Sequence, residues 1–346
     1  MRPTHDKLFD WILGLGPKSR YNLTSSGLPE PNLRSMGVGT SFEDFASERK
    51  TETEFLTAFA EEVAKLYGVD PENVVVTSGA SEAIFLVYGV LGHGLRAVVP
   101  LPNYPAMFTV PRFLGMSMAG RASRAGGARS SILGLTDSNN PTGRGLGDEA
   151  LDELVAHKRE AKVIFVNETY REFAFAGRPR THFGHSDEVV TCSTMTKFYG
   201  LGRLRVGWIL ADRPKAQRLL NGKWAISGHD SEYSLWLATQ VLRQRQRFVE
   251  RARLIYDRNA ALVSRFLEHT EGASSEIGPA PFCLIRYKKG PPSVDFARRL
   301  LEKTGTLVSP GDFFGAPRAF RLCFTADEQI LRGGLEALAD YLERSH

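Results

Sequence analysis

Lys197 is the residue whose surroundings most clearly allow chemistry. It follows the apolar run 189–193, the hydroxyl groups of Thr194 and Thr196 precede it, and Arg205 comes shortly after it. A lysine amine that its neighbours keep neutral attacks a carbonyl carbon and forms a Schiff base. A lysine after a strand is more often an ordinary surface residue, so this prediction depends on what the neighbouring segments add.

A candidate anion site lies in the turn Ser78-Gly79-Ala80-Ser81, between the apolar run 74–77 and a helical pattern. Gly and Ala permit a close approach of the backbone, and the N–H groups at the start of a helix attract an anion. A capped turn without a ligand would use the same residue types, because serine is common before a helix. Phosphate binding here is therefore a hypothesis that the other loops must support.

Three more loops supply aromatic, amide and phenol groups. Tyr104 stands in a proline-rich loop, Asn140 belongs to an Asn-Pro turn, and the segment Asn167-Glu168-Thr169-Tyr170 follows an apolar run. Taken singly, a buried tyrosine or a plain turn explains each of them. Taken in chain order with the anion turn, the lysine and the arginine, they are the parts that a pyridoxal phosphate site needs.

These loops follow short apolar runs that predict buried strands. Because the runs are continuous rather than alternating, both faces must be covered, which indicates a mostly parallel α/β sheet with helices on each side. In such sheets the ligand binds at the carboxyl ends of the strands. The predicted strands are 74–77, 97–99, 132–135, 163–166, 189–193 and 206–210, and the predicted helices are 55–66, 81–91, 104–115 and 148–159.

The pattern changes after a long helical stretch at 231–269. An α+β tail follows, with strands at 282–287 and 319–324 and helices at 293–304 and 326–344. Joined by the N-terminal segment, this tail predicts a smaller second domain. We therefore expect a large domain at residues 40–235 and a small domain made of residues 1–39 and 236–346.

Two motifs give the sequence a family resemblance. Asn140-Pro141-Thr142-Gly143 and the Thr-x-x-Lys-x-x-Gly-Leu-x-x-x-Arg run from Thr194 to Arg205 resemble the class I/II aminotransferases, which are fold-type I pyridoxal phosphate enzymes. The resemblance extends over roughly residues 20–345. It implies a large domain with a mostly parallel seven-stranded sheet, a smaller α+β domain, pyridoxal 5'-phosphate as the cofactor, and a homodimer.

The resemblance also implies a role for each candidate residue. Lys197 would form the Schiff base and shuttle the substrate proton as general base and acid. Arg321, in Phe320-Arg321-Leu322, would bind the α-carboxylate of the substrate, with Gly27 and Asn140 beside it. The cofactor would be held at its phosphate by Thr194, Arg205 and the amides of Ala80 and Ser81, on its ring face by Tyr104, at its ring oxygen by Asn140 and Tyr170, and at its ring nitrogen by Asn167.

Asn167 is the main departure from the family pattern, which has aspartate at this position. The aspartate keeps the pyridine nitrogen protonated, whereas a neutral asparagine leaves a weaker electron sink. The resemblance implies transfer of an amino group between an α-amino acid and a 2-oxo acid, and the alternative is elimination, cyclisation or decarboxylation. A substitution that traps an intermediate and a cofactor-binding protein with impaired catalysis are also compatible with Asn167.

Two smaller departures lie near the expected phosphate. Arg203 stands where the family has a small residue, and the segment 42–53 has no tyrosine to reach the phosphate of a neighbouring subunit. Within the family, Leu23-Thr24-Ser25-Ser26-Gly27 together with 81–86 is similar to the capreomycidine-synthase-like branch. Members of that branch eliminate and cyclise an arginine derivative.

Composition excludes several other classes of protein. The chain has 346 residues, a formal charge of +5 and three scattered cysteines, so we expect neither a disulfide framework nor a metal site. Its apolar runs are shorter than the ~18–20 residues that span a bilayer, and its start lacks the apolar region of a signal peptide. The arginines at 243–253 predict a solvated helix face rather than a nucleic-acid site. We expect a cytoplasmic enzyme without membrane or nucleic-acid partners.

Overall fold

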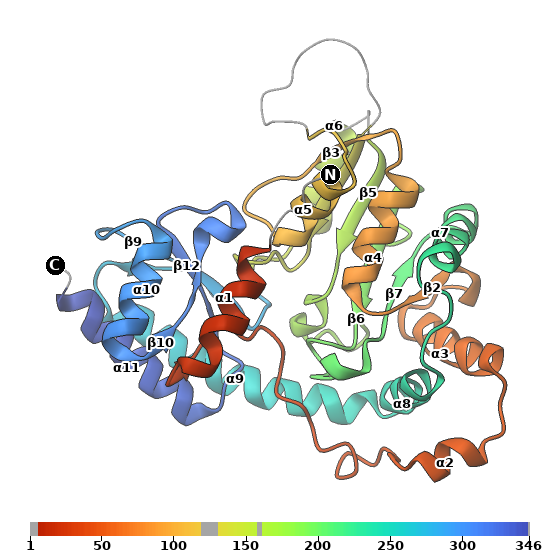
Figure 1. The fold of residues 1–346 in the computed structure, drawn as a ribbon, viewed down its shortest axis with the longest axis horizontal. Coiled ribbons are helices and arrows are strands. Elements are labelled where there is room, and N and C mark those ends of the chain that lie inside the picture. Colours follow the sequence, from red (N-terminus) through yellow and green to blue (C-terminus); the bar gives the residue numbers. More distant parts are fainter. Residues whose placement is uncertain (1–5, 119–130, 158–160, 345–346) are drawn as a thin grey trace.

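The fold contains two main sheets, a larger and a smaller one, which the chain forms largely one after the other, and a two-stranded sheet (Figure 1). The computed structural model describes residues 6–118, 131–157 and 161–344. In this part of the chain the larger sheet has six strands in the order β2-β7-β6-β5-β4-β3. Their bounds are β2 Val74–Thr77, β3 Arg96–Val98, β4 Ser131–Thr136, β5 Ala161–Asn167, β6 Val189–Thr194 and β7 Gly207–Leu210.

β7 makes the larger sheet mixed. Strands β3 to β6 pair in parallel, as predicted, whereas β7 lies antiparallel between β2 and β6. The loop 195–206 before β7 contains turns and one short 3-10 segment instead of the α-helix that usually connects parallel strands. The described residues form six strands of this sheet, against the seven that the family resemblance implies, and Ala97 also forms an isolated parallel bridge with Met118.

Helices cover both faces of this sheet. Val75 and Ile209 pack with α4, α5 and α7, whereas the adjacent residues Val76 and Trp208 pack with α3 and α8 on the other face. The strands are therefore buried on both sides, as their continuous apolar runs predict. The helices are α3 Glu52–Tyr67, α4 Ala80–Leu86 with a π-helical continuation to Leu91, α5 Pro105–Phe113, α6 Asp148–His157, α7 Arg213–Ile226 and α8 Glu232–Arg243.

The smaller sheet is antiparallel and lies toward the C-terminus. Its order is β11 Ser309–Pro310, β12 Ala319–Cys323, β9 Phe282–Tyr287 and β8 Ala273–Ser274. Helices α10 Ser293–Thr304 and α11 Glu328–Arg344 share its hydrophobic core. The predicted α+β tail is thus present in the structure.

The N-terminal segment packs with this C-terminal part. β1 Tyr21–Asn22 pairs in parallel with β10 Thr306–Leu307. Helix α1, Lys7–Leu15, lies between the two sheets, where Figure 1 shows it in red. The division of the chain at residues 40 and 236 stays a prediction.

Two helices occupy the stretch 231–269. α8 ends at Arg243 and α9, Arg245–His269, begins after Gln244 and runs below both sheets in Figure 1. Arg243, Arg247 and Arg253 at this junction are exposed, as predicted, whereas Arg245 and Arg251 are partly buried. Arg245 pairs with the buried Glu172 at 3.0 Å, and three others donate to backbone carbonyls: Arg247, Arg251 and Arg253. Among the described helices, none is both long and apolar enough to span a bilayer.

Candidate active site

A cavity of about 160 Å³ lies at the carboxyl ends of the parallel strands. Thr136, Asn167 and Thr194, the last residues of β4, β5 and β6, line it. The edge of the sheet thus collects side chains that are far apart in the sequence, as the parallel topology predicts. Every predicted site residue except Gly27 is in the wall, namely Ala80, Ser81, Tyr104, Asn140, Asn167, Tyr170, Thr194, Lys197, Arg205 and Arg321.

The turn between β2 and α4 forms an anion cradle together with Arg205. Gly79 has a φ of +79°, and a Cβ there would lie 2.9 Å from Arg205 Nη2, so glycine lets the guanidinium lie against the turn. Arg205 Nη2 donates to the Ser78 carbonyl at 3.0 Å. The amides of Ala80 and Ser81 open α4 beside this positive charge, which is the arrangement that attracts a phosphate.

Lys197 enters the cavity from the loop after β6. Desolvation, with the positive charge of Arg321 as the next cause, lowers the pKa of Lys197 to about 8. A neutral amine is therefore available near neutral pH, as a nucleophile requires. Gly27, which we expected in the substrate pocket, lies close to this lysine but is not among the residues that line the cavity. A Cβ at Gly27 would be 3.3 Å from Lys197 Cδ, so the glycine makes room for the lysine side chain.

Asn167 is oriented by its neighbour Thr169. Its Oδ1 accepts a hydrogen bond from the Thr169 backbone N–H at 3.1 Å and another from the Thr169 hydroxyl at 2.6 Å. A backbone N–H only donates, so the amide oxygen must face Thr169 and the Nδ2 group is left for the cavity. Asn167 therefore offers the cavity a hydrogen-bond donor and no charge.

Two tyrosines line the cavity as neutral phenols. Burial raises the pKa of Tyr104 to about 12 and also raises the pKa of Tyr170. The Tyr170 hydroxyl donates to Ser26 Oγ at 2.7 Å, which ties this wall to the N-terminal segment.

Arg321 on β12 is only 2% exposed and is held by several groups. Nη1 donates to Asn140 Oδ1 at 2.9 Å, and Nη2 donates to the Thr24 carbonyl at 3.0 Å. Its Cζ lies 5.5 Å and 4.8 Å from the ring centroids of Phe282 and Phe314. Among the described residues, its buried Nε has no partner. Such an unpaired donor is rare in a native fold, and it fits a site for an anionic group.

Helix α1 supplies a wall that the sequence analysis missed. Leu8, Phe9 and Ile12 line the cavity. The amphipathic pattern of 7–15 is a signal for such a helix, but a pattern does not say against which part of the molecule its apolar face packs. Thr136 and Thr196 are further lining residues that we did not predict.

The smaller departures lie away from the cavity. Arg203 is 87% exposed in its side chain and pairs with Glu30 at 3.2 Å. The segment 42–53 forms α2, Phe42–Ser47, and the start of α3. Figure 1 shows α2 at the outer edge of the molecule, so it does not reach the cavity of its own chain.

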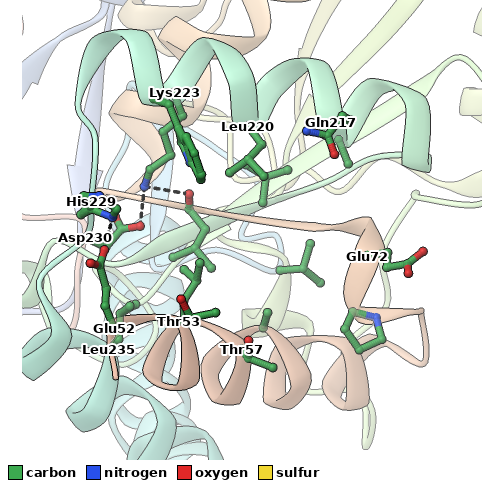
Figure 2. Close-up of a pocket in the computed structure, with 18 of the residues that line it drawn as sticks. Glu52, Thr53, Thr57, Glu72, Gln217, Leu220, Lys223, His229, Asp230 and Leu235 are labelled. Carbon is green, nitrogen blue, oxygen red and sulfur yellow. Dashed lines mark hydrogen bonds and ion pairs between the residues drawn. The ribbon is translucent and has the colours of Figure 1, made fainter. Parts of the chain in front are cut away.

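A larger cavity of about 730 Å³ lies between α3 and α7 (Figure 2). The positive charge of its buried lysine, Lys223, is compensated by an ion pair with Asp230. The same amine donates to the Val76 carbonyl at 3.1 Å. A paired lysine in a largely apolar groove is not a nucleophile. The amine, the buried guanidinium and the oriented amide occur together in the smaller cavity, which is therefore the candidate active site.

Known proteins share this sequence pattern and fold. Residues 46–338 match the family model described as aminotransferase class I and II. The chain is 26% identical over 341 residues to an LL-diaminopimelate aminotransferase of Syntrophobacter fumaroxidans, covering 90% of this chain and 88% of that relative. A solved PLP-dependent aminotransferase from Streptococcus suis superposes with a TM-score of 0.88 at 23% identity, covering 100% of this chain and 99% of that chain.

A cyclase has a similar fold. The PLP-dependent cyclase OrfR superposes with a TM-score of 0.80 at 23% identity, again covering 100% of this chain and 99% of that chain. None of these three proteins is described as a capreomycidine synthase, so the similarity to that branch is unsupported. The family model extends over most of the chain, and the protein therefore belongs to the aminotransferase class I and II family.

Proposed function

We propose that the protein is a pyridoxal 5'-phosphate-dependent aminotransferase that moves an amino group between an α-amino acid and a 2-oxo acid. The observation that carries this proposal is the meeting of Lys197 and Arg321 in one cavity. It brings an amine with a lowered pKa together with a buried guanidinium that has an unpaired Nε. Such a pair suits a substrate with an amino group and a carboxylate on the same carbon.

The cavity residues fit the cofactor. The cradle at Gly79 offers a phosphate the positive charge of Arg205 and the backbone N–H groups at the start of α4. The Nδ2 of Asn167 suits a ring nitrogen that accepts a hydrogen bond. When bound, pyridoxal phosphate supplies an aldehyde that binds amines and a ring that withdraws electrons. The residues that would hold it are Ala80, Ser81, Thr194 and Arg205 at the phosphate, Tyr104 and Asn167 at the ring, Asn140 and Tyr170 at the ring oxygen, and Lys197 at the aldehyde carbon.

Lys197 and Arg321 would act on different groups of the substrate. Arg321 binds the α-carboxylate and so orients the Cα–H bond toward the lysine. Lys197 Nζ removes the Cα proton as a general base, for which a pKa of about 8 is well matched to neutral pH. The same amine, protonated by this step, would also serve as the general acid, so one group would have both roles.

Absorption spectroscopy tests the proposal. Purified protein loaded with pyridoxal phosphate should show a visible band, and one or more amino acids should convert it to the band of pyridoxamine phosphate. Release of the matching 2-oxo acid in equal amount completes the test. A band that no amino acid changes would refute aminotransfer.

Attachment of the cofactor to Lys197 should accelerate through a midpoint near pH 8. Only the neutral amine attacks the aldehyde, and the pKa of Lys197 is lowered from 10.5 to about 8, so the amine is protonated below this pH and neutral above it. Stopped-flow mixing of the cofactor-free protein with pyridoxal phosphate measures the rate. Arg321→Gln removes a neighbouring positive charge and should move the midpoint to higher pH. A wild-type midpoint near 10.5 would contradict the prediction.

Asn167→Asp should raise the rate of the half-reaction by about tenfold. A hydrogen bond to a charged group contributes about 1.5–3 kcal/mol against about 0.5–1.5 for a neutral one, and about 1.4 kcal/mol is a factor of ten in rate. The two donors of Thr169 would hold one oxygen of the new carboxylate and leave the other for the ring nitrogen. Single-turnover absorbance measures the rate, and Asn167→Ala is the uncharged control.

An unchanged or slower half-reaction in Asn167→Asp would favour the second candidate function. That candidate is elimination, cyclisation or decarboxylation of an amino acid with the same cofactor. The neutral Asn167 and the cyclase with a similar fold are the observations that favour it.

A homodimer in the cytoplasm is part of the proposal. The large apolar side chains of Phe42, Trp224 and Ile226 are exposed on the single chain, and contact with a second copy would cover them. Sedimentation of the native protein as a monomer would refute the dimer.

A further inference from the structure

Helix α1 presents an apolar wall to the cavity that holds Lys197 and Arg321. Leu8, Phe9 and Ile12 are spaced so that they lie along one side of the helix, and all three line the cavity. Phe9 is 48% exposed, so a bound ligand can still cover part of its ring. Leu13, on the same helix, is 72% exposed and is not part of this wall.

The wall is held in place by the rest of the chain. Trp11 Nε1 donates to the Val308 carbonyl at 3.0 Å, and its ring packs against Phe313 with centroids 5.8 Å apart. Asp6 caps the helix by accepting from the Leu8 N–H at 3.0 Å. Val308 precedes Ser309, whose hydroxyl accepts from Arg321 Nη2 at 3.4 Å. The position of α1 is therefore coupled to the residue that would bind the carboxylate.

A bound amino acid has only one group without a partner in this arrangement. Its carboxylate would bind Arg321, and its amino group would lie at the aldehyde carbon of the cofactor, beside Lys197. Only its side chain then has no assigned partner. The cations among the described lining residues are Lys197, Arg205 and Arg321, and each of them already has a role. Asp6, at the start of α1, adds negative charge that also contributes to the raised pKa of Tyr104. An acidic side chain would therefore find no counter-charge in this wall.

We infer that the enzyme acts on amino acids with an uncharged, apolar side chain, aliphatic or aromatic, which packs against Leu8, Phe9 and Ile12. The inference rests on the proposed aminotransferase function and adds the substrate class. Burial of an apolar side chain against such a wall contributes to binding in proportion to the area that leaves water. A dicarboxylic amino acid would lose the hydration of its second carboxylate without compensation.

Rates and binding of four amino acids test the substrate class. We expect kcat/KM of the half-reaction to be at least about tenfold higher for leucine and phenylalanine than for aspartate and glutamate, because even one methylene changes discrimination by about tenfold or more. Dissociation constants of the α-methyl derivatives, which lack the Cα proton, should follow the same order and report binding alone. A preference for aspartate or glutamate in both measurements overturns the inference.

Variants of α1 test the wall itself. Phe9→Ala and Ile12→Ala should each lower kcat/KM for leucine or phenylalanine by about tenfold while the absorption band of the bound cofactor stays unchanged. Leu13→Ala is the matched control, because it removes an apolar side chain from the same helix outside the cavity, and it should have no effect. Equal effects of all three variants would overturn the inference.

A gain of function makes the test independent of damage to α1. Ile12→Arg would place a cation in the wall and should raise kcat/KM for glutamate relative to leucine by at least about tenfold. An unchanged ratio overturns the inference.

The two proposals fail differently: if no amino acid converts the cofactor band, the proposed function fails and this inference fails with it. If dicarboxylic substrates convert the band best, only this inference fails.

Discussion

Lys197→Ala is expected to abolish covalent attachment of pyridoxal phosphate and to slow the half-reaction by about 10²–10⁴-fold, which is the usual contribution of a positioned acid or base. The variant loses both the amine that attacks the aldehyde and the group that moves the Cα proton. It keeps the phosphate cradle at Arg205, so the cofactor should still bind without a covalent bond. Borohydride reduction followed by peptide mass spectrometry measures the attachment.

The chain carries an internal control for this experiment. Lys223 is also a buried lysine, but it pairs with Asp230 and lies in the larger cavity between α3 and α7. Reduction of the wild type should label the peptide that contains Lys197 and leave Lys223 unlabelled. Lys197→Arg should fail like the alanine variant, because a guanidinium stays protonated and cannot serve as the nucleophile. Covalent labelling that persists in Lys197→Ala would contradict the assignment of the lysine.

The parts of the site that local sequence determines could be predicted. Lys197 and Arg205 belong to one loop after a buried strand, and the strands β4 to β6 end at the same edge because they are parallel. Helix ends also depend on residues close together in the sequence. Thr51 and Glu54 form a capping box at the start of α3, and Gly68 ends the helix with a φ of +72°. Periodicity and turn chemistry therefore locate both the elements and the strand-end loops.

The parts that depend on distant contacts could not be predicted. Trp11 holds α1 against Val308, which is 297 positions away in the sequence, so no local signal places Leu8 or Phe9 in the cavity. The orientation of the Asn167 amide depends on the rotamer of Thr169, which a sequence does not show. The antiparallel β7 follows from how the loop after Lys197 turns back, and continuous apolar runs look the same in either direction.

Arg321→Ala is expected to raise KM for the amino acid by about 10- to 100-fold while leaving covalent attachment of the cofactor at Lys197 intact. Hydrogen bonds to charged groups contribute about 1.5–3 kcal/mol, and about 1.4 kcal/mol is a factor of ten in affinity. The guanidinium also fills space between Phe282 and Phe314 and satisfies Asn140 Oδ1. The alanine variant should therefore lose stability as well, which a thermal melt records separately.

Arg321→Lys separates the geometry of the guanidinium from its charge. The lysine keeps the positive charge and much of the buried volume but lacks the planar fork that binds a carboxylate through two hydrogen bonds. We expect KM to stay raised by about tenfold in this variant while the melting temperature recovers toward that of the wild type. Loss of the cofactor band in either variant, with the protein still folded, would place Arg321 at the cofactor instead of the substrate. Retention of the wild-type KM in Arg321→Lys would show that charge alone holds the carboxylate, and the unpaired Nε would then need a different explanation.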